Sequence, residues 1–69
     1  MTPEEKELLK LKDDIKEDLK DLFKKYLKTF DHDIPEPDDR EAAVLIVTTM
    51  QSALEELKCE IVEGKYDNF

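Results

Sequence analysis

The 69-residue chain contains one cysteine, one histidine and one glycine, and each scarcity excludes a class of fold or site. Cys59 has no second cysteine to pair with, so no internal disulfide forms, which fits a reducing compartment. Cys59 and His32 are too few for a zinc site built on cysteine and histidine. Gly64 alone cannot build a glycine-rich phosphate loop. We therefore expect no metal and no cofactor.

Long apolar runs are also missing. The longest uncharged stretch, residues 42–54, is shorter than the roughly 20 residues that span a bilayer, and polar side chains interrupt it. The first residues are polar and acidic, unlike the basic and apolar start of a secretory signal. The sequence thus predicts a cytoplasmic protein with no membrane partner.

Charged residues are abundant, at 43% of the chain with a net charge of −8. Such a composition also occurs in disordered chains. The apolar residues are strongly periodic, however, and this favours packed helices. Because a chain of this length buries only about 60% of its unfolded surface, oligomerisation is the expected route to a stable fold.

Residues 3–30 are predicted to form a first helix. Thr2 fits an N-cap, Pro3 the first helical position, and Glu5 the second half of a capping box. Apolar residues then recur in steps of three and four, at Leu8, Leu11, Ile15, Leu19, Leu22, Tyr26 and Phe30, with Leu9, Phe23 and Leu27 widening the stripe. This is the period of an amphipathic helix, here about 42 Å long.

An acidic linker, residues 31–38, separates the two helices because Pro35 and Pro37 do not fit a continuous helix. Asp38 is the predicted N-cap of a second helix over about 39–63, with Glu41 completing a capping box. Gly64 is expected to end this helix in the left-handed conformation, before a short tail over 64–69. This tail is expected to fray unless Tyr66 and Phe69 dock on a neighbour. The expected core face is Ala43, Ile46, Val47, Met50, Ala53, Leu54, Leu57 and Ile61.

The predicted fold class is all-α, with one antiparallel two-helix hairpin domain over residues 1–69. Val44 and Leu45 add apolar surface beyond the core face, which is more than one partner helix covers. We expect a second copy to cover this surface and to complete a four-helix bundle as a homodimer. The expected self-association residues are Ala42, Val44, Leu45, Val47, Thr48 and Met50.

Acidic residues gather at the linker end of the hairpin. Residues 31–41 hold six acids and one arginine, a net charge of −5. One interpretation is a docking surface for another protein, a basic one, formed by Asp31, Asp33, Glu36, Asp38, Asp39 and Glu41. The alternative is a solvated loop with a helix cap. An EF-hand is excluded, because Glu36 and Ala42 stand where such a loop needs glycine and glutamate.

A ridge of lysines follows the first helix, at Lys12, Lys16, Lys20, Lys24 and Lys28. Asp13, Glu17 and Asp21 each precede one of these lysines by three residues, so a solvated face with i,i+3 ion pairs is the favoured interpretation. The alternative is a nucleic-acid-binding ridge. In length, hairpin plan and acidic tail region the chain is similar to Rop, a helical-hairpin dimer that binds paired RNA loops. The resemblance implies an RNA-binding adaptor that uses these lysines.

No catalytic arrangement is expected. His32 has no nucleophile beside it in the sequence, and Cys59 has no partner pattern for a catalytic thiol. A small carboxylate–metal enzyme using Glu55, Glu56, Glu60 and Glu63 is a third alternative. The leading hypothesis is a small non-enzymatic interaction or regulatory module that acts as a homodimer. Small regulators encoded by phages and other mobile elements often have this layout.

Overall fold

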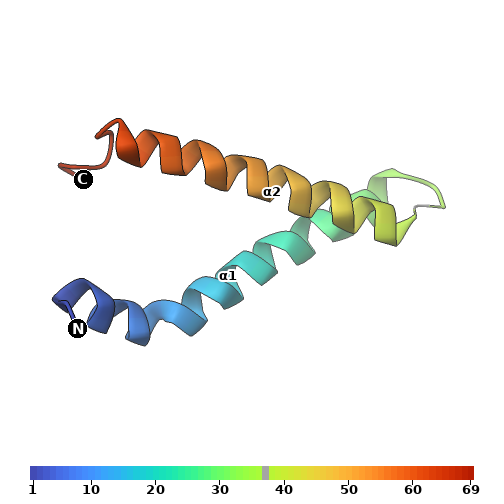
Figure 1. Ribbon diagram of the computed structural model, residues 1–69. Helices are drawn as coiled ribbons and strands as arrows, with labels where there is room; N and C mark the ends of the chain where they lie inside the picture. Colours follow the sequence, from blue (N-terminus) through green and yellow to red (C-terminus); the bar gives the residue numbers. More distant parts are fainter. Residues whose placement is uncertain (37) are drawn as a thin grey trace.

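The computed structural model describes residues 1–36 and 38–69, which form two helices joined by a short linker (Figure 1). Helix α1 spans Pro3–Asp33 and helix α2 spans Asp39–Val62. The described residues contain no strand, so the prediction of an all-α chain with two helices packed together is confirmed. The predicted helix-breaking role of Pro37 lies outside the described residues.

The start of α1 follows the predicted capping box. The Thr2 hydroxyl accepts a hydrogen bond from the Glu5 N–H at 3.1 Å, and the Glu5 carboxylate accepts one from the Thr2 N–H at 3.2 Å. The helix ends three residues later than expected, with the Ile34 N–H donating to the Phe30 carbonyl. Pro35 explains this end point, because a proline restricts the residue before it and Ile34 is extended.

Both ends of α2 are capped by hydrogen bonds. Asp38 Oδ1 accepts a hydrogen bond from the Glu41 N–H at 3.1 Å. At the other end Gly64 has a φ of +86°, its N–H donates to the Ile61 carbonyl, and the Lys65 N–H donates to the Glu60 carbonyl. This pair of bonds is a Schellman motif, which confirms the predicted left-handed end.

Replacing Gly64 with alanine should destabilise the end of α2. The new Cβ would lie 2.9 Å from Asp67 Oδ2, which is the end of a flexible side chain and can move away. The remaining cost is the left-handed backbone, about 1–2 kcal/mol for a residue with a Cβ. We expect urea unfolding to show this loss for Gly64→Ala and a smaller one for Gly64→Asn. Equal stability of the wild-type protein and the two variants would contradict a left-handed conformation at Gly64.

The tail after Gly64 folds back instead of fraying. The Tyr66 hydroxyl donates to Glu60 Oε2 at 3.2 Å, and the rings of Tyr66 and Phe69 meet edge to face at 6.0 Å. Lys65 Nζ lies 3.6 Å from the same Glu60 carboxylate oxygen. The expectation of a frayed tail overlooked these local partners one to two turns back along α2.

The two helices form an open V (Figure 1). They meet beside the linker and diverge towards the chain termini, which lie at the same end of the molecule. We call residues 19–30 of α1 and 42–54 of α2 the closed half, and residues 3–18 and 55–62 the open arms. The radius of gyration is 15.9 Å, against about 11 Å for a compact chain of this length.

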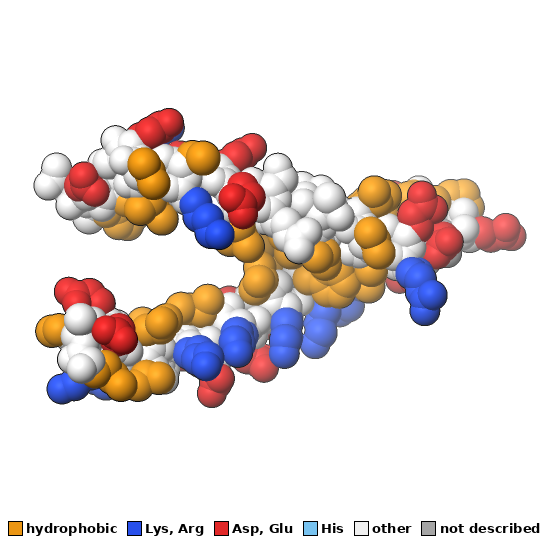
Figure 2. All heavy atoms as spheres, viewed as in Figure 1, with side chains coloured by type: hydrophobic (Ala, Val, Ile, Leu, Met, Phe, Trp, Pro, Cys, Tyr) orange, Lys and Arg blue, Asp and Glu red, His pale blue; other side chains and the backbone are white. Residues whose placement is uncertain are grey.

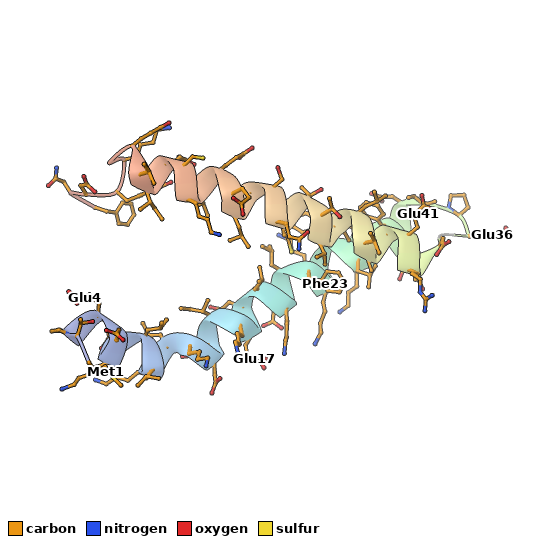
Figure 3. The ribbon with its side chains drawn as sticks, viewed as in Figure 1. Met1, Glu4, Glu17, Phe23, Glu36 and Glu41 are labelled. Atoms are coloured by element: carbon orange, nitrogen blue, oxygen red, sulfur yellow. The ribbon has the colours of Figure 1, made fainter. Side chains whose placement is uncertain are left out.

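The core of the hairpin is small and lies in the closed half. Only Ala42 and Ile46 are buried among the described residues, at 4% and 7% exposure. Phe23, which lies where the helices meet (Figure 3), is half-buried and packs around this core together with Leu27, Phe30, Ala43 and Met50. The small Ala42 side chain allows the two backbones to approach closely.

The expected core faces were partly wrong. On α1 the main stripe is exposed from Leu8 to Tyr26, and the residues that widen it, Phe23 and Leu27, are half-buried instead. On α2 the expected core residues Val47, Leu54, Leu57 and Ile61 are exposed as well. In the arms the helices diverge and leave the stripes uncovered, and in the closed half a single partner helix covers only part of each stripe.

Candidate self-association surface

The hairpin exposes far more surface than a folded monomer of its size. Its accessible area is 6,382 Å², whereas a compact protein of 8.1 kDa exposes about 4,500 Å². The excess is about 1,900 Å² per chain, or about 3,800 Å² for two chains, which falls in the range buried by obligate homodimers. Large apolar side chains supply much of the exposed area on both helices (Figure 2).

The predicted self-association residues differ in how much of their side chain is exposed and available to a second chain. Val44, Leu45 and Val47 are exposed apolar side chains, whereas Met50 is half-buried. Ala42 already packs inside the hairpin and leaves little side chain for a partner. The Thr48 hydroxyl donates to the carbonyl of Val44 at 2.7 Å, so this threonine is satisfied within its own helix.

A first apolar groove runs along one side of the closed half, with a volume of about 330 Å³. Its α1 wall is the exposed stripe that was expected to face the core, and its α2 wall includes the predicted residue Leu45. The lining residues are Leu22, Tyr26, Phe30, Leu45, Ile46, Thr49, Met50 and Ala53. The groove therefore joins the exposed stripes of both helices.

A second apolar groove, of about 280 Å³, shares Met50 with the first. Its lining residues are Leu19, Lys20, Phe23, Val47, Met50, Gln51 and Leu54. Val47 follows Leu45 by two residues, and such residues lie about 200° apart on a helix. The two grooves therefore flank the contact between α1 and α2 on opposite sides, and the closed half is apolar on both.

The open arms carry apolar side chains that have no partner in the hairpin. Figure 2 shows open space between the arms. Ile15 is 53% exposed on α1 and Ile61 is 58% exposed on α2, and Leu11 and Leu57 are exposed beside them. The sequence pattern was interpreted as a hairpin core at these positions, and they were not among the residues predicted for self-association.

The acidic linker end brings carboxylates of both helices together. The pKa of Asp39 is raised above its ordinary 3.8. The largest cause is a hydrogen bond with Asp31, and repulsion from the Asp31 carboxylate, partial loss of hydration and repulsion from Asp38 follow in that order. Asp33, Glu36 and Glu41 are exposed around them, and Figure 3 places Glu36 at the tip of the linker. The predicted docking residues thus share one end of the molecule.

Replacing Asp31 with asparagine should stabilise the hairpin at neutral pH. A raised carboxyl pKa means that the folded state binds the proton more tightly than the unfolded state, so ionisation of Asp39 costs stability above that pKa. Asp31 also carries its charge in the last turn of α1, where the helix dipole disfavours an acid. We expect a higher melting temperature for Asp31→Asn at pH 7, and an advantage that fades as the pH falls through the raised pKa of Asp39. A difference in melting temperature that does not depend on pH would contradict repulsion between Asp31 and Asp39 as the cause. The same rise in melting temperature for the mid-helix control Asp14→Asn would contradict it as well.

The lysine ridge of α1 is exposed along its whole length. None of its five lysines, from Lys12 to Lys28, lies within 4.0 Å of a carboxylate oxygen among the described residues, so the expected i,i+3 pairs are not formed at contact distance. Such pairs do occur elsewhere, between Lys10 and Glu7 and between Lys58 and Glu55. An exposed ion pair is only slightly more stable than the two separately hydrated charges, which explains why only some of the possible pairs form.

The residues considered for catalysis are only partly brought together. One open depression at the end of α2 is lined by Cys59 and by the glutamates Glu55, Glu56, Glu60 and Glu63, whereas His32 is exposed on α1. Glu60 is engaged by Tyr66 and Lys65, and no three histidine, cysteine or carboxylate side chains within the described ranges come together as metal ligands. Over the same ranges, neither helix combines the length and the apolar character that crossing a bilayer requires.

Comparison of the chain with protein-family models, with curated proteins and with solved structures gave no match. The function is therefore argued from the surfaces of the hairpin alone.

Proposed function

We propose that this chain is a non-enzymatic protein-interaction module that works as a homodimer. The observation that carries the proposal is the excess of exposed surface, about 1,900 Å² per chain over a compact monomer of this mass. Soluble monomers rarely expose contiguous apolar patches larger than a few hundred Å². A two-fold symmetric interface uses the same surface on both subunits, so a second copy of the chain can cover this surface.

The acidic linker end is the second part of the proposal. In the dimer it stays free, because its exposed side chains are carboxylates and the apolar grooves lie along the helices. Six acids in eleven residues create a strong local negative potential, which attracts a basic protein surface. The dimer would present two such ends to a partner of positive charge.

The mass of the protein in solution tests the dimer directly. Sedimentation equilibrium of the full chain between about 1 and 100 μM should give twice the monomer mass of 8.1 kDa. The melting temperature should also rise with protein concentration, since association stabilises the folded state by mass action. A folded monomer over this whole range would refute the proposal.

A further inference from the structure

We propose that two hairpins interlock, so that the open arms of each copy lie in the two apolar grooves of the other. This inference rests on the proposed homodimer and assigns the contacts within it. The occupant of both grooves is a second copy of this chain. Four features of the hairpin support the arrangement: the grooves, the arms, the repeat of the stripes and the distribution of charge.

The closed half and the open arms have complementary shapes. The closed half is a pair of contacting helices with an apolar groove on each side. The open arms are a pair of separated helices with unpartnered apolar residues, among them Ile15 and Leu57 (Figure 2). An arm that lies along a groove packs its ridge of side chains between two helices, as in a helical bundle. Two arms thus straddle one closed half.

The stripes on both helices continue unchanged from the closed half into the arms. On α1 the apolar steps are three, four and four from Leu8 to Leu19, and the same steps repeat from Leu19 to Phe30. On α2 the same three steps lead from Ala43 to Leu54, and steps of three and four continue into the arm at Leu57 and Ile61. An 11-residue repeat over three turns keeps a stripe almost on one face of a helix. The arms therefore carry the same kind of packing face as the closed half, although no residue of their own chain covers it.

Charge decides the relative direction of the two copies. Each hairpin concentrates a net charge of −5 in residues 31–41, at the linker end. A parallel dimer would place both clusters side by side. An antiparallel dimer places them at opposite poles of a molecule whose single hairpin is already 49 Å long, far beyond the Debye length of about 8 Å at physiological salt. Insertion of arms into grooves requires this antiparallel direction as well.

Charge does not assign the arms to the grooves, because residues 3–18 hold seven acids and four lysines and residues 55–63 hold four glutamates and one lysine, a net charge of −3 in each case. The arrangement put to the test has the partner's α1 arm in the first groove, beside Thr49 and Leu22, and its α2 arm in the second groove.

The first test compares two charges on the α1 arm. Ile15→Glu places a carboxylate on the stripe that enters the groove, whereas Lys10→Glu places one on the same arm at a side chain that is 76% exposed and lies on the opposite face of the helix. By sedimentation equilibrium we expect Ile15→Glu to raise the dimer dissociation constant at least about 30-fold, and Lys10→Glu less than about 3-fold. A wild-type dimer that Ile15→Glu leaves unchanged would overturn the arm insertion but not the homodimer.

The second test cross-links the α1 arm of one copy to the first groove of the other. It introduces no charge that could unfold the arm. In a Cys59→Ser background, Ile15→Cys and Thr49→Cys are placed in one chain. Within one chain Thr49 lies beside Leu22, because both line the first groove. Ile15 precedes Leu22 by seven residues, or about 10.5 Å along α1, which is too far for a disulfide between positions 15 and 49 of the same chain. We expect mild oxidation to give a covalent dimer on a non-reducing gel, and the pair Lys10→Cys with Thr49→Cys to give none. If the protein is dimeric by sedimentation and neither pair cross-links, the interlocked arrangement is wrong; a monomeric wild-type protein refutes the homodimer itself.

Discussion

Replacing Ile46 with aspartate is expected to abolish the folded hairpin. Ile46 is 7% exposed and, with Ala42, forms the whole buried core of the described residues. A carboxylate there has no cationic partner, and an unpaired buried charge costs about 3–5 kcal/mol. The total stability of a chain this small is of the order of 5 kcal/mol, so the loss is comparable to all of it. We expect most of the helical circular dichroism signal at 222 nm to disappear at 25 °C.

Two further variants separate this cause from a general effect of substitution. Val62→Asp introduces the same residue on the same helix at a side chain that is 87% exposed, and it should cost less than about 1 kcal/mol. Ile46→Val removes one methylene from the core and should cost about 0.5–1.5 kcal/mol. A folded Ile46→Asp protein, with a melting temperature near that of Val62→Asp, would show that Ile46 is not the centre of the fold.

Replacing Leu45 with glutamate is expected to dissociate the homodimer. Leu45 is 52% exposed in the hairpin, so the monomer accommodates a carboxylate at this position. In the proposed dimer the groove that it lines is covered, and an unpaired charge buried in such a contact costs about 3–5 kcal/mol. The dissociation constant should therefore rise by at least about 30-fold. Sedimentation equilibrium measures this shift, and the melting temperature should fall with it.

The matched control for this prediction is Leu45→Met, which keeps the apolar volume and should change the dissociation constant by less than about 10-fold. Val62→Glu adds the same charge to the far end of α2 and should leave the dimer intact. A Leu45→Glu protein that remains dimeric at micromolar concentration counts against the groove beside Leu45 as part of the interface. Dissociation by both glutamate variants would point instead to the net charge of the chain.

The helices and their ends could be predicted because local chemistry determines them. The bonds between Thr2 and Glu5, the cap at Asp38 and the left-handed Gly64 are all short-range and have recognisable residue types. The late end of α1 was missed because the acidic residues 31–33 resemble a loop by composition. They remain helical because the first proline that restricts the backbone is Pro35.

The packing could not be predicted from the same pattern. A periodic stripe shows which face of a helix is apolar, but it does not show which helix covers that face. Phe23 and Leu27 are half-buried where the neighbouring stripe residues Leu22 and Tyr26 are exposed, so the helices meet on the edge of the stripe and not on its centre. The meeting of Asp31 and Asp39 was also hidden, since it depends on where the turn places two helix ends.

The position of the closed half next to the linker has a consequence for how the chain folds. The entropy lost on closing a loop grows with the logarithm of its length, so the first contacts form most readily across the shortest connection. Here those contacts include the buried core of the described residues, and every later turn adds helix outward towards the chain ends. We therefore expect folding to begin beside the linker and to spread outward, with the arms reaching their final packing only in the proposed dimer.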